Sequence, residues 1–253
     1  MQTTIDQLKD LRLLGLLAAW QDQGQSPTYH DLSFDERFAL LVEQEHQRRQ
    51  NQRLHRRLQQ AHLPCTVALA QVDFAVPRGL RKTHFLELAQ GNWVKQHLGL
   101  ILLGPTGIGK SFLAAVLADN LCKLQFTVRY FKTADLLVEI KFAKADGSWP
   151  KLRAQLRATQ LLILDEWLRD PISTFEARDL LDLLDDRYRI HSAMLVSQVP
   201  VPQWHAQIQD PTIADALLDR IVHDAIRLNL KGESMRKLTS PLTPNDVEQT
   251  EII

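Results

Sequence analysis

Residues 100–111 read LILLGPTGIGKS, and this stretch decides the fold. The first four residues are a short apolar run typical of a buried strand, and the last eight match the pattern GxxxxGK[ST] in every position. An apolar-periodic stretch follows to residue 124 and predicts a helix. A strand, a glycine-rich turn and a helix in this order form a phosphate-binding loop. The sequence therefore predicts a P-loop domain that binds ATP.

Each residue type in this loop has a chemical reason. Glycines let backbone N–H groups converge on phosphate oxygens, and the amino end of the following helix adds partial positive charge. We expect Lys110 to reach the β- and γ-phosphates and the Ser111 hydroxyl to ligate Mg²⁺. The predicted nucleotide-binding residues are Gly104, Pro105, Thr106, Gly107, Ile108, Gly109, Lys110, Ser111 and Phe112.

A second element, LLILDE, occupies residues 161–166, and its Asp165 lies 54 residues after Ser111. Four apolar residues predict a buried strand whose carboxyl end presents two carboxylates, and in a P-loop sheet that end faces the phosphates. We expect Asp165 to hold Mg²⁺ and Glu166 to polarise the attacking water, which favours hydrolysis over transfer to a small acceptor. The alternative is that these carboxylates only begin a turn.

Two further candidates come from later segments. The apolar run 193–196 ends in Ser197 and Gln198, and a polar side chain there is expected to contact the γ-phosphate, with Gln198 favoured. The alternative is a polar turn before Pro200. Arg220, next to Asp219 on a predicted helix, is a candidate for the cation that a neighbouring subunit supplies to a P-loop active site. The alternative is a solvated helix face.

The rest of the pattern predicts an α/β fold with a small helical N-terminal module, residues 1–65, before a three-layer domain, residues 66–253. Short apolar runs separated by helices are typical of a parallel sheet covered on both faces. The expected strands are 100–103, 127–131, 161–164, 193–196 and 225–230. The expected helices are 5–22, 33–61, a short one between 81 and 97, 110–124, 133–145, 151–159, 173–190 and 211–223.

Charge is balanced overall but not along the chain. The chain has 253 residues with 30 basic and 30 acidic side chains, a balance that by itself argues against a nucleic-acid partner. Residues 1–45 carry a net charge of −5, whereas residues 46–103 carry +7.

No apolar run approaches a membrane span, so no membrane association is expected. Cys65 and Cys122 form no metal or CxxC pattern, which fits a reducing cytoplasm.

Two basic patches are candidate DNA contacts. No acidic residue lies between Glu45 and Asp73, and an arginine stripe on a helix there would bind a nucleic-acid backbone without reading sequence. The alternatives are a solvated helix face or a site for an acidic protein. The first patch is Arg48, Arg49, Arg53, Arg56 and Arg57. The second patch is Lys141, Lys144, Lys151, Arg153 and Arg157, in which we expect Trp149 to pack rather than stack on bases.

Taken together, several motifs resemble one family. They are VPRGLRKTHFLELAQGNWV before the P-loop, GPTGIGKS, LLILDE, and LVSQVPVPQWHAQIQDPTIADALLDRIVHDAIRLNLKGESMRK from residue 195. The chain looks like the IstB-type helper ATPases of bacterial insertion sequences, which are AAA+ proteins related to the DnaC-type helicase loaders. The resemblance spans nearly the whole chain.

This resemblance implies an ATP-dependent homo-oligomer that binds duplex DNA with little sequence preference and assists a cognate transposase. It places Gln198 at the sensor-1 position, Arg220 at the trans-acting arginine position, and the second basic patch where related proteins carry DNA-facing helices. Arg236 lies in a family motif whose role stays open. The family often has an aromatic-Gly pair where this chain has Trp167-Leu168, and no C-terminal lid is evident.

Alternative functions stay open on the sequence. A DnaC-like replicative helicase loader would use the same ATPase but grip a helicase through its N-terminal module. A small-molecule P-loop kinase would need an acceptor pocket. A non-hydrolysing ATP-dependent DNA scaffold would not need Glu166.

Overall fold

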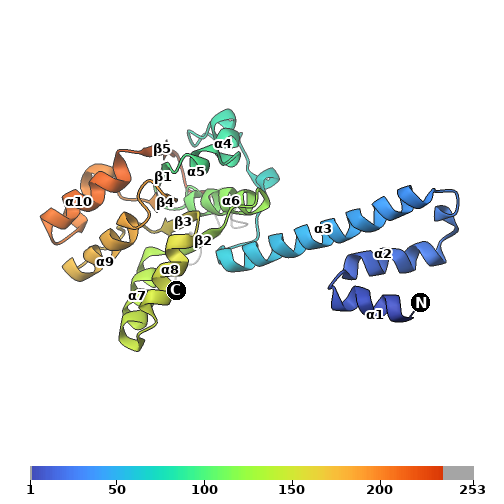
Figure 1. Cartoon of the computed structure of the whole chain (residues 1–253). Coiled ribbons are helices and arrows are strands. Elements are labelled where there is room, and N and C mark those ends of the chain that lie inside the picture. The colour runs from blue at the N-terminus through green and yellow to red at the C-terminus, as the bar shows by residue number, and fades with distance from the viewer. Residues whose placement is uncertain (1, 236–253) are drawn as a thin grey trace, which may run out of the picture. The chain divides into compact units, whose positions relative to one another are not determined.

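The computed structural model of the protein describes residues 2–235. They form two compact units that divide within one long helix, between Arg56 and Arg57 (Figure 1). The first unit is helical, and the second contains the sheet. The expected division of function after residue 65 stays a prediction, because compactness does not by itself define a functional module.

The first unit consists of α1 (Gln2–Asp10), α2 (Leu14–Gln25), the short 3₁₀ helix η1 (Pro27–Tyr29) and the first part of α3 (Phe34–Ala61). The start of α3 is capped as its sequence indicates: Ser33 N donates to Glu36 Oε2 over 2.8 Å, and Glu36 N donates to Ser33 Oγ over 3.3 Å.

The expectation of one helix over residues 5–22 is wrong, because the chain breaks between α1 and α2, where Arg12 adopts a φ of +57°. The break gives α2 a free amino end, and the carboxylate of Glu45 accepts hydrogen bonds from Gly15 N at 2.6 Å and Leu16 N at 3.3 Å. The apolar periodicity of the sequence continues through the break and therefore gives no sign of it. The break is instead stabilised by Glu45, which lies 30 residues from Gly15.

The sheet of the second unit is parallel throughout, as predicted, with the strand order β2-β3-β4-β1-β5. Its strands within the described residues are β1 (Gly99–Leu103), β2 (Val128–Lys132), β3 (Leu161–Asp165), β4 (Ser192–Ser197) and β5 (Ala225–Asn229). In the register, Leu103 lies beside Ser197. The carboxyl ends of β1, β3 and β4 therefore meet at one edge of the sheet.

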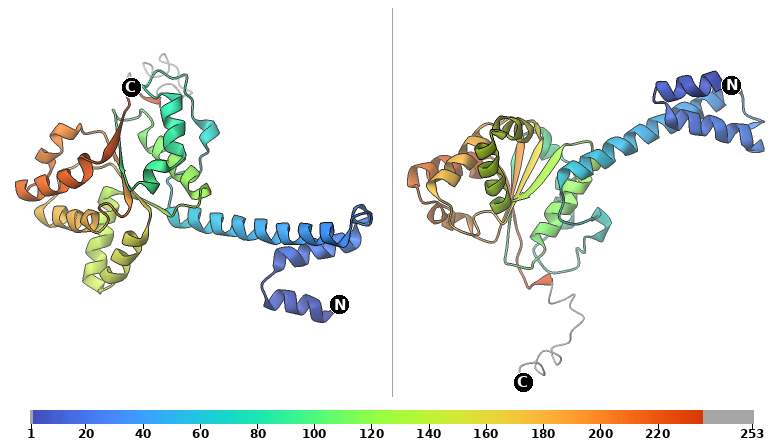
Figure 2. Two further views of the ribbon diagram at one scale, coloured as in Figure 1. Left: turned by 45° about the horizontal axis from the view of Figure 1, so that its top comes forward. Right: turned by 90° about the horizontal axis from the view of Figure 1, so that it is seen from below.

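Helices cover both faces of this sheet, which is seen nearly edge-on in the right-hand view of Figure 2. The helices are α4 (Lys82–Ala89), α5 (Asn92–Lys95), α6 (Lys110–Lys123), α7 (Thr133–Asp146), α8 (Trp149–Ala158), α9 (Thr174–Asp185) and α10 (Pro211–Val222), with 3₁₀ turns η2 (Leu69–Gln71), η3 (Val201–Gln203) and η4 (His205–Gln207). The short helix expected between residues 81 and 97 is present as α4, and a further turn, α5, follows it. Gly91 separates the two, since its φ is +75° and a Cβ there would lie 2.6 Å from Leu121.

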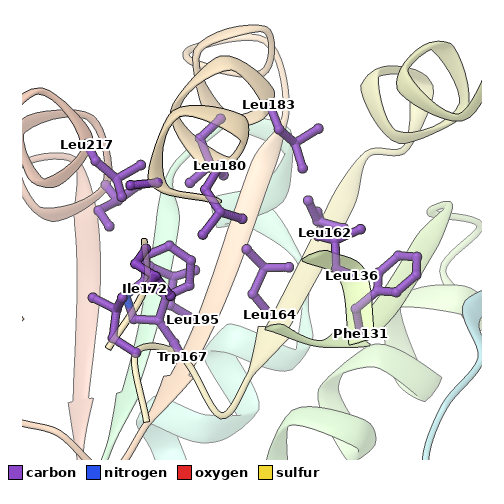
Figure 3. Close-up of a cluster of buried hydrophobic side chains, with 14 of the residues drawn as sticks. Phe131, Leu136, Leu162, Leu164, Trp167, Ile172, Leu180, Leu183, Leu195 and Leu217 are labelled. Carbon is purple, nitrogen blue, oxygen red and sulfur yellow. The ribbon is translucent and has the colours of Figure 1, made fainter. Parts of the chain in front are cut away.

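One large apolar core lies between the sheet and α7–α10. Leu180 and Leu183 of α9 lie over Leu162 and Leu164 of β3, as Figure 3 shows. Burial of β1, β3 and β4 on both faces explains why these strands are continuous apolar runs rather than alternating ones. None of the helices within residues 2–235 combines the length and apolarity that crossing a lipid bilayer requires.

Replacement of Glu45 tests the break between α1 and α2. We expect Glu45→Gln to weaken the capping of α2, with a loss of about 1–3 kcal/mol because buried donors lose a charged acceptor. Amide hydrogen exchange of residues 14–17 should accelerate. Glu43→Gln is the matched control, since Glu43 is exposed and accepts only from Gln47. Equal exchange in both variants would contradict the capping role.

The same carboxylate predicts an acid dependence. Its hydrogen bonds, the one from Arg48 foremost, lower the pKa of Glu45 from 4.5 to about 2 against the opposing effect of burial. A depressed pKa means that the folded unit binds this proton less tightly than the unfolded chain. The contribution is therefore complete above about pH 4.5 and is lost as the pH falls toward 2. Exchange of the same amides between pH 5 and 2 measures it, and Glu45→Gln should remove most of the dependence.

Candidate active site

The predicted phosphate-binding loop lies between β1 and the start of α6 at Lys110. Gly107 has a φ of +81° and Gly109 a φ of +96°. A Cβ on Gly107 would lie 2.1 Å from Ser234 Oγ, so only glycine fits there. The loop thus turns sharply into a helix whose first N–H groups lack partners within the helix, which is the arrangement that binds phosphate.

Lys110 lies over this loop. Its Nζ donates to Gly104 O over 2.7 Å and to Pro105 O over 2.8 Å. Burial lowers the pKa of Lys110, and the negative charge of Asp165 opposes that effect. The ammonium group is therefore held at the mouth of the loop, where phosphate oxygens would replace the two carbonyls as its partners.

Asp165 ends β3, as predicted, and is almost fully buried. Its Oδ1 accepts from Glu166 N over 2.7 Å, its Oδ2 accepts from the Tyr130 hydroxyl, and its backbone carbonyl accepts from Thr133 Oγ1 over 2.9 Å. Burial is the main cause that raises the pKa of Tyr130, and the hydrogen bond to Asp165 is the second. The Ser111 hydroxyl interacts with the Tyr130 hydroxyl and partly opposes this shift. Tyr130 therefore links the two predicted magnesium ligands.

Tyr130 was not among the residues predicted from the sequence. A signal was available, since it carries the single hydroxyl in the apolar stretch of β2 and lies two residues before the end of that strand. The oxygen donors of Ser111 and Asp165 fit Mg²⁺, which prefers one or two carboxylates together with phosphate oxygens. Residues 2–235 hold no cluster of three or more His, Cys, Asp or Glu side chains that would bind a metal by protein ligands alone.

Glu166 lines the same cleft, which has a volume of about 470 Å³ and is bordered by the P-loop, Asp165 and Gln198. Its backbone adopts a φ of +55°. Its Oε1 lies 3.2 Å from Lys132 Nζ, and its Oε2 pairs with Arg169. The structure therefore brings both predicted carboxylates to the phosphate loop.

At the end of β4 the two polar candidates differ. Ser197 is buried, and its Oγ donates to Trp167 O over 2.7 Å and accepts from Val199 N over 3.0 Å. Gln198 is exposed in the cleft, where its Oε1 accepts from Thr106 Oγ1. The geometry therefore favours Gln198 as the residue that reaches the phosphate end. Its sensing role stays a prediction.

Arg220 is not in this cleft. It lies in the last turn of α10, where its guanidinium pairs with the Asp185 carboxylate and its Nη1 donates to Ala216 O over 2.9 Å. That position is near the amino ends of the strands, away from the phosphate loop of the same subunit. A catalytic role for Arg220 thus requires the cleft of another subunit.

Several predicted DNA contacts are engaged within the protein. Arg48 and Arg49 pair with Glu45, and Arg57 donates to the carbonyl of Cys122 over 2.6 Å. In the second patch, Lys144 pairs with Asp179 and Arg153 makes two hydrogen bonds to Asp186. Trp149 packs against the core, as expected. The patch residues that are exposed, and whose side chains make no hydrogen bond or ion pair with the described residues, are Arg53, Arg56, Lys141, Lys151 and Arg157.

Comparison with known proteins agrees with this site. The model of a family described as IstB-like ATP binding protein matches residues 6–242. The chain belongs to this family. A curated relative, insertion sequence ATP-binding protein y4pL of Sinorhizobium fredii, is 38% identical over 234 residues, which are 92% of this chain and 96% of that protein. The resemblance inferred from the motifs is confirmed.

Solved structures share the fold. DnaI matches with a TM-score of 0.56 at 19% identity, covering 65% of this chain and 90% of that chain. AMPPCP-bound DnaA from Aquifex aeolicus matches with a TM-score of 0.57 at 16% identity, covering 74% and 60%. These identities establish the fold alone, that of a P-loop AAA+ domain. Together with the family match they make the chain an ATP-binding protein of an ATPase family.

Leu168 occupies the position where the resemblance led us to expect glycine. Its φ is +49°, so the backbone keeps a left-handed conformation that glycine adopts without strain. The Leu168 side chain is 1% exposed and lies in the core beside Trp167, whose ring meets that of Trp204 edge-on with centroids 6.1 Å apart. Apolar burial therefore offsets the strain. The predictions about Arg236 and about a C-terminal lid concern residues outside the described range.

Removal of the Tyr130 hydroxyl tests its role beside the metal ligands. Partners that orient metal ligands typically change affinity by 10–100-fold. We expect Tyr130→Phe to weaken Mg²⁺ binding in the presence of ADP by about tenfold while the circular dichroism spectrum stays unchanged. Tyr29→Phe is the matched control, because Tyr29 also donates to an aspartate, Asp22, but in the first unit. Calorimetric titration with Mg²⁺ measures the effect, and an unchanged affinity in Tyr130→Phe would rule out this role.

Proposed function

We propose that this protein hydrolyses ATP, binds duplex DNA without reading its sequence, assembles on target DNA as a homo-oligomer and assists the cognate transposase of an insertion sequence. One observation carries the proposal: a P-loop and a carboxylate strand end converge on one cleft in a chain of the IstB-like family. Relatives named as ATP-binding proteins of insertion sequences support the transposition context. We place this activity in the cytoplasm.

In the proposed reaction, the P-loop amides and Lys110 bind the phosphates, and Ser111 and Asp165 hold Mg²⁺. The ion supplies positive charge at the β- and γ-phosphates when it is bound. Glu166 accepts the proton of the attacking water, for which it must exchange its contact with Arg169 for one with water. Gln198 contacts the γ-phosphate end of the cleft and reports its loss.

Assembly completes the proposed site. A trans-acting arginine accelerates phosphoryl transfer by roughly 10³–10⁵-fold, and Arg220 lies where only another subunit's nucleotide would meet it. ATP bound between subunits then couples nucleotide state to oligomer formation. The isolated subunit is accordingly expected to be a weak ATPase, and oligomerisation and DNA are expected to stimulate it.

We propose that DNA binding also depends on assembly. The formal net charge of one subunit is zero, and only part of the two basic patches is free of internal partners. Weak, salt-sensitive phosphate contacts by one subunit add up when several subunits bind the same duplex. The contacts we propose are those through Arg53, Arg56, Lys141 and Lys151.

A replicative helicase loader is the second candidate, because the fold is also similar to that of the DnaC helicase loader, with a TM-score of 0.50 at 15% identity. The two functions differ in the partner protein. Affinity capture with the full chain, in the presence of either the cognate transposase or the host's replicative helicase, separates them. Capture of the helicase alone would replace the transposition proposal.

Loss of the P-loop lysine tests the coupling of nucleotide to DNA. We expect Lys110→Ala to abolish ATP-dependent DNA binding, because the phosphates lose their cation at the mouth of the loop. Lys123→Ala, at the other end of the same helix, is the control. Electrophoretic mobility shift with and without ATP measures the effect. Full-affinity, ATP-dependent DNA binding by Lys110→Ala would contradict the coupling.

Loss of Arg220 tests the trans arrangement. Arg220→Ala should retain ATP affinity but lose at least about 10³-fold in DNA-stimulated turnover. Arg178→Ala, an exposed arginine on α9, should leave both unchanged. Equilibrium binding of a fluorescent ATP analogue and phosphate release supply the two readouts. Unchanged turnover would remove Arg220 from the site.

A further inference from the structure

A second pocket lies at the opposite end of the sheet from the phosphate loop. It has a volume of about 50 Å³ and is bordered by the amino-terminal halves of β1 and β4 and by the chain that enters β4. Room of this size holds three or four waters, which is the space of one tetrahedral oxyanion. The basic side chains at its wall are His97, Arg187, Arg189, His191 and Arg220.

Arg187 is the most unusual of these residues. It is 1% exposed, its Nη1 donates to Leu156 O, and its Nη2 donates to Ser192 O over 2.7 Å. Its Nε is buried and has no hydrogen-bond partner. Within residues 2–235 no carboxylate lies within ion-pair distance of it. Burial lowers the pKa of Arg187 to about 10, so the fold buries a cation and supplies no counter-charge.

The charges around it do not balance this cation. Asp224 is the one carboxylate at the pocket wall among the described residues, and it lies 3.8 Å from Arg189 and accepts a hydrogen bond from the Tyr188 hydroxyl at 3.3 Å. Arg220 has its own partner, Asp185, outside the wall.

His97 and His191 also line the pocket and add no negative charge to it. Their rings lie edge to face with centroids 6.2 Å apart. Burial, then the charge of Arg187, then that of His97 lower the pKa of His191. Arg189 and Arg220 thus each have a carboxylate partner, whereas Arg187 has none among the described residues, and an anion would be its missing partner.

We infer that this pocket binds a phosphate-type oxyanion. Arginine forks match the oxygens of phosphate, and two imidazoles add further donors at the same wall. The oxyanion has two possible sources: free phosphate, or a phosphate of the nucleotide held by a second copy of this chain. The first source is independent of the proposed function, whereas the second rests on it, because Arg220 belongs to both sites.

The first experiment uses the full chain saturated with MgADP, so that the phosphate loop is filled. Calorimetric titration with inorganic phosphate, against chloride at matched ionic strength, measures binding to the remaining site. Arg189→Ala and His191→Ala, both at the rim, should each weaken binding by about tenfold. Arg178→Ala, an exposed arginine outside the pocket, should not. Arg187→Met should abolish binding, and if that variant does not fold, the two rim variants carry the test.

The second experiment identifies the source. ATP turnover is measured for Arg189→Ala in the DNA-bound assembly with Arg178→Ala as control. Phosphate binding that the rim variants weaken, with unchanged turnover, assigns free phosphate. Turnover that falls about tenfold in Arg189→Ala alone, without phosphate binding by the MgADP-loaded chain, assigns the nucleotide of a second copy.

The inference would be overturned if the chain showed neither phosphate binding in this pocket nor a fall in turnover in Arg189→Ala. Equal phosphate binding by wild type, Arg189→Ala, His191→Ala and Arg187→Met would overturn it for the free ion. Phosphate binding in this pocket by a chain that hydrolyses no ATP would remove the proposed function and leave the pocket assigned.

Discussion

The parallel register of β1, β3 and β4 is the constraint on which the site depends. Parallel pairing brings the carboxyl ends of these strands to one edge, and the register sets the phosphate loop after Leu103 beside Ser197. Asp165 and Gln198 then reach the loop from neighbouring strands without any long-range adjustment. Such a sheet is stable only when both faces are covered, so the large core under α7–α10 and the position of the cleft are two consequences of the same topology.

Many charged side chains of this protein form ion pairs within the fold. Glu45 caps α2 and pairs with Arg48 and Arg49. Lys144 of α7 pairs with Asp179 of α9, and Arg153 of α8 pairs with Asp186, the residue that follows α9. What is left for a DNA partner is a sparse set of exposed cations on an electrically neutral subunit. A protein of this kind gains affinity through assembly, because many weak contacts on one duplex act together.

The sequence predicted the strands, most of the helices and the position of the phosphate loop between β1 and α6, since each depends on local periodicity or on a contiguous motif. The features that it did not predict depend on distant partners. The break before α2 depends on Glu45, and the hydrogen bond of the Tyr130 hydroxyl depends on Asp165 on the next strand. Likewise, a run of arginines cannot show which of its members are already paired within the fold. The burial of Arg187 is also not evident from the sequence, because one of its two carbonyl partners, Leu156 O, lies 31 residues away.

The central claim is that one subunit's cleft is completed by another subunit's Arg220. Mixing two inactive variants tests it most directly. Glu166→Gln keeps Arg220 but lacks the base, and Arg220→Ala keeps the base but lacks the arginine. If the arginine acts between subunits, the mixture on duplex DNA should regain a sizeable fraction of wild-type turnover, because some interfaces pair an intact cleft with an intact arginine. A mixture no more active than either variant alone, although both assemble on DNA, would contradict this account.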